Sequence, residues 1–137
     1  MIKQLTREVE ARIPAPAADP VVAVLGRQGA LPRHLPSGWT IRRLSDLDDA
    51  RPGEIVLLSG VGVGEVRRAR AMLPRRTTIV VVIDEWASAE LVAEVLSAGA
   101  DACVRDGHPA ILAGHLVACR RRQLAERWAN LDLARAA

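Results

Sequence analysis

Three wholly aliphatic runs most strongly limit the folds that this chain can adopt. They are VVAVLG (Val21–Gly26), EIVLLSG (Glu54–Gly60) and TTIVVVID (Thr77–Asp84). A strand with one face in water alternates apolar and polar residues, but these runs do not alternate, so both of their faces must be covered. Two weaker strands are predicted over WTIRRL (Trp39–Leu44) and DACVRDG (Asp101–Gly107). The sequence therefore predicts an α/β fold with a doubly wound, five-stranded parallel sheet.

The segments between these strands supply the helices that cover the sheet. Helices are predicted over residues 64–73 and 88–99, and a long last helix over residues 109–134. Ser88 is the expected N-cap of the second helix, and Gly99 is its expected C-cap. The connection after the first strand carries two Pro and two Gly, and the connection after the second strand is polar. Little or no helix is expected in either of these two connections.

At 137 residues, the chain is long enough for one domain with a single core. Residues 1–20 are predicted to form a short N-terminal helix followed by a Pro- and Ala-rich linker. Residues 21–122 form the predicted α/β domain, and residues 123–137 form a C-terminal extension of the last helix.

The composition argues against several classes of protein. The net charge of +3 is too small to indicate nucleic-acid binding by itself, and the apolar runs are too short to span a bilayer. The start of the chain lacks the apolar region of a signal peptide. Cys103 and Cys119 have no CxxC spacing and no His pair at metal-binding spacing, so they are expected to be buried or half-buried thiols. We therefore expect a cytoplasmic protein without a metal or a cofactor.

A glycine loop follows the second aliphatic run, where nucleotide-binding proteins hold phosphate, and it consists of Gly60, Gly62 and Gly64. Its G-x-G-x-G spacing differs from the dinucleotide fingerprint, and the third fingerprint position is Glu65, whose carboxylate would repel a pyrophosphate. Asp84 ends the next strand about 20 residues later, where a ribose-binding acid belongs. The glycines are predicted to form a tight turn, and nucleotide binding stays open as the alternative.

The second half of the chain resembles a known family. The segment AELVAEVLSAGADACVRDGHPAILAGHLVACRRR (Ala89–Arg122) is similar to the last third of a response-regulator receiver domain of the CheY-like family. In that family a helix ends in Ala-Gly-Ala-Asp, a short strand follows, and the final helix ends in basic residues. GEIVLLSG and TTIVVVID resemble the third and fourth strands of the family. The resemblance covers about residues 21–122 and implies a flavodoxin-like, receiver-like three-layer sandwich.

The resemblance also implies where phosphorylation chemistry would lie, and this chain departs from the family there. The phosphate-accepting Asp at the end of the third strand corresponds to Ser59, a degenerate phosphoacceptor position. The acidic pair that binds Mg²⁺ after the first strand corresponds to Gly26 and Arg27, although Mg²⁺ needs oxygen ligands. A serine hydroxyl without an adjacent base cannot replace a carboxylate in acyl-phosphate chemistry.

The remaining family positions differ as well. The switch Thr or Ser after the fourth strand falls at Ile83 or Asp84, and the Lys-Pro pair after the fifth strand falls at Asp106 and Gly107. The aromatic switch position is Cys103. Because every phosphorylation role is missing, the resemblance implies an atypical pseudo-receiver.

Catalysis and nucleic-acid binding are weaker interpretations. Ionisable residues at or just past strand ends could do acid–base work, but none adjoins a nucleophile; they are Asp84, Glu85, Asp106 and His108. We therefore expect no enzyme. The Arg clusters in residues 67–76 and 120–122 have no stacking aromatics between them, so a solvated face or a protein contact explains them better than nucleic acid.

The leading interpretation is a phosphorylation-independent receiver domain of a signal-transduction or transcription regulator that dimerises or binds a protein partner. Family dimers often form through the elements that correspond to residues 88–122. The expected interaction face consists of Leu91, Val95, Leu124, Trp128 and Leu131, of which the last three form a stripe at helical spacing. Packing of that stripe on its own domain is the alternative.

Whether a DNA-binding output domain follows residue 137 in the full-length protein stays open. The second functional interpretation is a small α/β module that binds a nucleotide or another ligand at the glycine loop, with Asp84 and Asp106 nearby.

Overall fold

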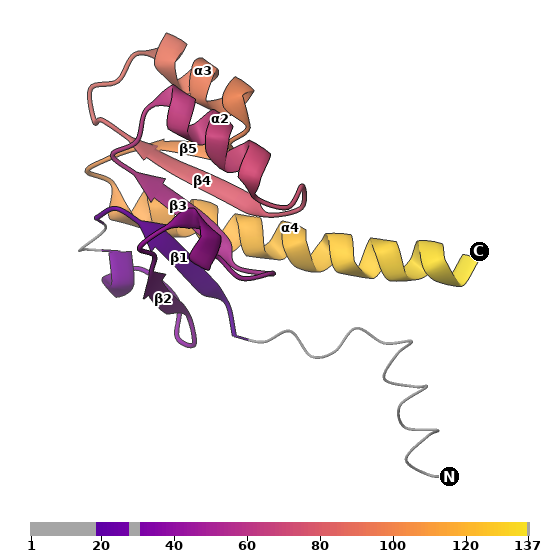
Figure 1. Ribbon diagram of the computed structural model, residues 1–137. Coiled ribbons are helices and arrows are strands. Elements are labelled where there is room, and N and C mark those ends of the chain that lie inside the picture. The colour runs from indigo at the N-terminus through magenta and orange to yellow at the C-terminus, as the bar shows by residue number, and fades with distance from the viewer. Residues whose placement is uncertain (1–18, 28–30, 137) are drawn as a thin grey trace.

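The computed structural model describes residues 19–27 and 31–136, and side chains as far as residue 133. Its centre is a five-stranded parallel sheet in the order β2-β1-β3-β4-β5 (Figure 1). The strands are β1 (Val21–Leu25), β2 (Thr40–Arg43), β3 (Ile55–Ser59), β4 (Thr78–Ile83) and β5 (Ala102–Arg105). The predicted doubly wound parallel sheet is confirmed. The predicted N-terminal helix lies outside the described residues.

Helices cover both faces of this sheet (Figure 1). Helices α2 (Val63–Met72) and α3 (Ala89–Ala98) lie on one face, and α4 (Pro109–Ala136) lies on the other together with the 3-10 turn η1 (Leu31–Arg33). The connection between β2 and β3 contains only a second 3-10 turn, η2 (Leu47–Asp49). None of the helices in the described part of the chain is long and apolar enough to cross a membrane.

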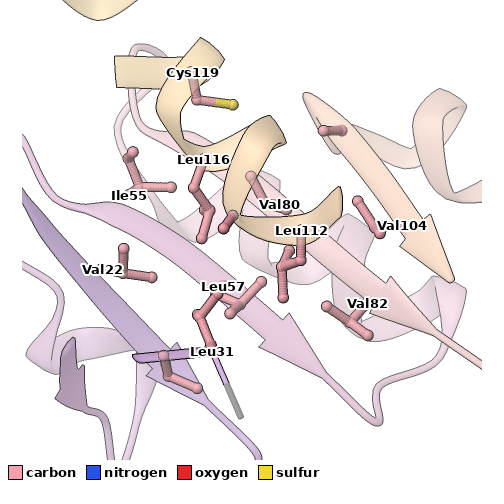
Figure 2. Close-up of a cluster of buried hydrophobic side chains, with 13 residues drawn as sticks. Val22, Leu31, Ile55, Leu57, Val80, Val82, Val104, Leu112, Leu116 and Cys119 are labelled. Atoms are coloured by element: carbon pink, nitrogen blue, oxygen red, sulfur yellow. The ribbon is translucent and has the colours of Figure 1, made fainter. Parts of the chain in front are cut away.

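The central strands bury both of their faces, which explains why their sequences do not alternate. In β3, Ile55 and Leu57 pack toward α4, whereas Val56 and Leu58 pack toward α2 and α3. All four side chains are at most 1% exposed. Figure 2 shows the layer on the α4 side, where Leu112 and Leu116 of α4 lie over the sheet. Full burial of each such side chain is worth about 1.5–3 kcal/mol.

The edge strand β2 is attached to the sheet by a partly buried ion pair. Arg42 of β2 donates to Glu54, which precedes β3, through Nη2 at 2.6 Å and Nε at 2.9 Å. Glu54 is 6% exposed and also accepts a hydrogen bond from the backbone N–H of Arg51. The hydrogen bond from Arg42 is the main reason that the pKa of Glu54 is lowered. The pair therefore links β2 to β3 across the intervening strand β1.

The Ala-Gly-Ala-Asp segment has a clear structural role at the end of α3. Gly99 has φ +126°, and a Cβ at this position would lie 2.5 Å from Cγ of Arg70. Arg70 in turn donates to the carbonyl oxygens of Pro74 and Thr77, both at 2.9 Å. The carboxylate of Asp101 accepts the backbone N–H of Ile79 at 2.8 Å, at the start of β4. The segment thus joins α2, α3 and β4.

Both predicted ends of α3 are confirmed. The Ser88 hydroxyl oxygen accepts the backbone N–H of Leu91 at 3.1 Å, and Gly99 is the C-cap with a positive φ. The predicted long last helix is also confirmed, and it continues well beyond the edge of the sheet (Figure 1).

We expect Leu116→Ala to lower the free energy of unfolding by about 2–5 kcal/mol, because it opens a cavity between α4 and the sheet. Leu116 is 0% exposed. The matched control is Leu133→Ala in the same helix, where the side chain is 68% exposed and a change within about 0.5 kcal/mol is expected. Urea unfolding followed by circular dichroism compares the two variants. Equal losses would contradict the position of the core.

Candidate functional site

The residue that matches the family phosphoacceptor lies at the carboxyl edge of the sheet. Ser59 is the last residue of β3, is half-buried, and pairs with Val82 of β4. Ligands of open α/β sheets bind at this edge.

The end of β1 packs directly on Ser59. Gly26 follows β1 with φ +114°, and a Cβ at Gly26 would lie 2.4 Å from the carbonyl oxygen of Ser59. A contact this short leaves no room for any side chain at Gly26 unless the backbone moves. The next residue, Arg27, is exposed. The backbone of Ser59 therefore occupies the space that an acidic side chain at position 26 would need.

The acidic residues at the ends of β4 and β5 accept hydrogen bonds from neighbouring backbone. Asp84 Oδ1 accepts the N–H of Trp86 at 3.3 Å, and Asp106 Oδ1 accepts the N–H of Gly107 at 2.8 Å. Both aspartates are exposed, as is His108, whereas Ile83 is 7% exposed and belongs to the core. These two carboxylates order the turns that follow their strands.

In residues 19–27 and 31–136, no group of three or more His, Cys, Asp or Glu side chains could hold a metal ion.

The two cysteines lie in different layers of the molecule. Cys103 packs with the core on the α2 and α3 side, and Cys119 belongs to the core under α4. Burial is the main cause that raises the pKa of each thiol. A raised pKa disfavours the reactive thiolate, which fits the expected half-buried thiol at Cys103 and buried thiol at Cys119.

The glycine loop is a turn that leads into α2. Gly60 has φ +74°, and Gly62 is the N-cap of α2. The carboxylate of Glu65 lies 3.5 Å from the N–H of Gly62, at the position where a helix N-terminus would receive an anion. A cavity of about 170 Å³ adjoins the loop, and its apolar lining consists of Leu25, Leu47, Leu58 and Val61.

The five residues of the expected interaction face do not form one surface. Leu91 and Val95 are in α3, on the opposite side of the sheet from α4. Val95 is only 1% exposed and is part of the core, so it was wrongly included. Trp128 is 51% exposed, and its neighbours Leu124 and Leu131 are half-buried.

The cavities beside α4 indicate which side of the helix carries the stripe of Leu124, Trp128 and Leu131. Arg122 and Glu126 line a small cavity with Asp101, next to β5. Arg120 and Arg127 line another cavity with the loop that precedes β3. Leu124 and Leu131 follow these two arginines by one helical turn and therefore share their side of α4. The stripe therefore lies on the side of α4 that faces away from Arg122, Glu126 and β5.

Sequence reasoning missed one exposed aromatic residue at the carboxyl edge. Trp86 lies in the turn after β4 and is 84% exposed. Trp86 lies between the predicted strand and the predicted helix, and this position in a connection could have indicated that its side chain is exposed.

Comparison with solved structures identifies the architecture. An orphan response regulator of H. pylori has a TM-score of 0.59 and 15% identity; the alignment covers 77% of this chain and 99% of that one. A signal receiver domain of an HD domain-containing protein from Pseudomonas fluorescens Pf-5 has a TM-score of 0.62 and 16% sequence identity. That alignment covers 84% of this chain and 96% of the other chain. This chain has a receiver fold. No protein-family profile matches it, and no curated protein matches it. Within the receiver fold, Ser59 is the last residue of the third strand in chain order.

We expect Gly26→Ala to lower the free energy of unfolding by about 2 kcal/mol or more, because its Cβ would meet the carbonyl oxygen of Ser59 and its φ is +114°. Gly64→Ala is the control, since Gly64 lies in α2 with nothing within 4 Å of its Cβ position. It should raise stability by about 0.5–1 kcal/mol. Thermal and urea unfolding measure the expected loss of stability in Gly26→Ala and the expected gain in Gly64→Ala. A neutral Gly26→Ala would disprove the close approach of β1 to Ser59.

Proposed function

We propose that this protein is a phosphorylation-independent receiver module of a signal-transduction or transcription regulator, and that it works by binding rather than by catalysis. One observation carries the proposal. At the edge where the family transfers phosphate, Ser59 ends β3 and the backbone of Gly26 lies against it. The two similar structures are described as an orphan response regulator and a signal receiver domain, which supports a signalling role.

Phosphate transfer to this edge lacks both of its chemical requirements. A serine hydroxyl stays protonated near neutral pH, so it does not replace the ionised carboxylate that accepts phosphate in the family. Mg²⁺ requires several oxygen ligands, and the positions that match the family acidic pair carry a glycine and an exposed arginine. A side chain added at Gly26 would also collide with Ser59. Restoring an aspartate at position 59 alone would therefore not restore the function.

We infer that the binding surface is the apolar stripe on the extended part of α4, consisting of Leu124, Trp128 and Leu131. Trp128 is large and half-exposed, and α4 extends past the sheet, where no element of the described fold covers its outer side (Figure 1). A second copy offers the same stripe, so two α4 helices can pack against each other with twofold symmetry. Dimerisation through α4 would also align any output domains that follow this helix, including the proposed DNA-binding domain.

Nucleotide binding at the glycine loop is the less favoured function. Glu65 places its carboxylate beside the N–H of Gly62, where a phosphate group would have to bind. An anion would first have to displace this like charge.

Acetyl phosphate with Mg²⁺ should leave no phosphate adduct on the wild-type protein, as measured by intact-mass spectrometry. Ser59→Asp should also stay unmodified, because the Mg²⁺-binding acids are still missing. A stoichiometric, acid-labile adduct on the wild type would refute the proposal. An adduct on Ser59→Asp alone would show that the space beside β1 is open to a phosphodonor.

Trp128→Glu should weaken a homodimer by at least about tenfold, since burial of a large apolar side chain contributes about 1.5–3 kcal/mol and the new carboxylates would face each other. Leu133→Glu is the matched control: it adds the same charge to the same helix, about 140° around the axis from Trp128. Sedimentation equilibrium over a range of micromolar concentrations compares them. A monomeric wild type, or equal weakening by the two variants, would place the stripe outside any dimer interface.

A further inference from the structure

The cavity of about 170 Å³ beside the glycine loop lies at the carboxyl edge of the sheet and has an apolar floor. The ends of β1 and β3 form the middle of this floor, where Leu25 lies beside Leu58. Leu47 of η2 and Val61 of the glycine loop complete it. Leu58 is fully buried, and the other three side chains are half-buried. A small apolar group that settled on this floor would remove apolar surface from water, which favours binding.

The walls of this cavity belong to elements that the fold holds in place. At the end of β2, the N–H of Leu44 donates to a carbonyl oxygen of β1 at 2.8 Å. In the turn that follows, the N–H of Asp49 donates to the carbonyl oxygen of Asp46 at 3.1 Å, and the carbonyl oxygen of Asp49 accepts from Nη2 of Arg42. On the other side, α2 is packed on the sheet through Val66, which is 0% exposed. The cavity is therefore a feature of the folded chain without a ligand.

Charged side chains of both signs stand around the apolar floor. Glu65 and Arg68 of α2 are three residues apart, so their side chains are neighbours on one face of the helix. Asp46 contributes a second carboxylate from the opposite wall, and its side chain makes no hydrogen bond as the N-cap of η2. All three residues are exposed, and within residues 19–27 and 31–136 none of them forms an ion pair. These charges are therefore available to a ligand.

We propose that this cavity binds an aliphatic α-amino acid such as leucine. The ammonium and carboxylate groups of an amino acid share one carbon atom, so its receptor needs opposite charges side by side, as Glu65 and Arg68 are. The guanidinium of Arg68 binds the ligand carboxylate through paired N–H donors. The carboxylates of Glu65 and Asp46 accept hydrogen bonds from the ligand ammonium. The aliphatic side chain of the ligand then lies on Leu25 and Leu58.

The charge and size of the cavity separate this ligand from a nucleotide. The lining carries two carboxylates against one guanidinium, so a phosphate or another simple anion meets net negative charge. The only hydrogen bond of the Glu65 carboxylate in the described part of the chain is the long one of 3.5 Å from the N–H of Gly62. The volume of about 170 Å³ is small beside the ~300–1,000 Å³ of typical ligand pockets, which favours a compact molecule.

This site goes beyond the proposed dimer and does not depend on it. All of its lining residues come from one chain, and none of them lies on α4. A bound amino acid would contact both η2 and α2, so it would link the connection before β3 to the helix after β3. A protein that stays monomeric could therefore still bind the ligand, and the two proposals fail or succeed separately.

Isothermal titration calorimetry of the full chain in about 150 mM salt tests the site with L-leucine as the probe. Leucine should bind with a dissociation constant below about 1 mM. L-Leucinamide, which lacks the carboxylate, and 4-methylpentanoate, which lacks the ammonium, should each bind at least about tenfold more weakly. Glycine, which lacks the apolar side chain, should also bind at least about tenfold more weakly. No binding of leucine, or equal binding of any of these three analogues, would overturn the proposal.

Variants locate the site in the chain. Asp46→Asn and Arg68→Gln should each weaken leucine binding by about tenfold or more, because each removes a charged partner of the ligand. Both residues are exposed, so the fold should stay intact. The matched controls are Asp48→Asn in η2 and Arg67→Gln in α2, which remove the same charges from exposed residues outside the cavity lining. Unchanged binding by both cavity variants, or equal losses in the controls, would exclude the cavity as the site.

Discussion

Two-sided burial of β3 and β4 is the constraint on which the other elements depend. Neighbouring residues such as Leu57 and Leu58 pack into opposite apolar layers, one under α4 and the other under α2 and α3. A sheet buried in this way needs a helical layer on each face, and its strands must be parallel because helices connect them. The carboxyl ends of the strands therefore meet at one edge and their amino ends at the other.

These two edges differ in chemistry. At the carboxyl edge, Gly26 packs on Ser59, and the carboxylates of Asp84 and Asp106 bond to their own turns. At the amino edge, α4 extends beyond the strands and lines a cavity with the loops before β3 and β4. The two binding proposals therefore concern opposite edges of the sheet: the cavity beside the glycine loop lies at the carboxyl edge, and the apolar stripe lies where α4 passes the amino edge.

The two helix caps predicted from local pattern at α3 are confirmed, whereas the predicted grouping of five residues on one interaction face is not. Ser88 and Gly99 were recognised as caps because their residue types stabilise helix ends directly. Val95 was placed on an interaction face although it is buried, because the pattern of a helix shows an apolar stripe without showing what covers it. For the same reason, the sequence grouped Leu91 with Trp128 although the sheet separates their helices.

The sequence by itself determined the fold class and the residue type at each strand end. Strands formed by non-alternating aliphatic runs must be buried on both faces. The sequence also shows directly that position 59 carries a serine and not an acid. Only the tertiary structure decided that the backbone of Gly26 lies on Ser59, and that the loop before β4 and the second half of α4 line one cavity. These contacts join segments far apart in the chain. Their geometry depends on how β1 lies beside β3 and how α4 lies across the sheet, and local residue preferences do not encode that packing.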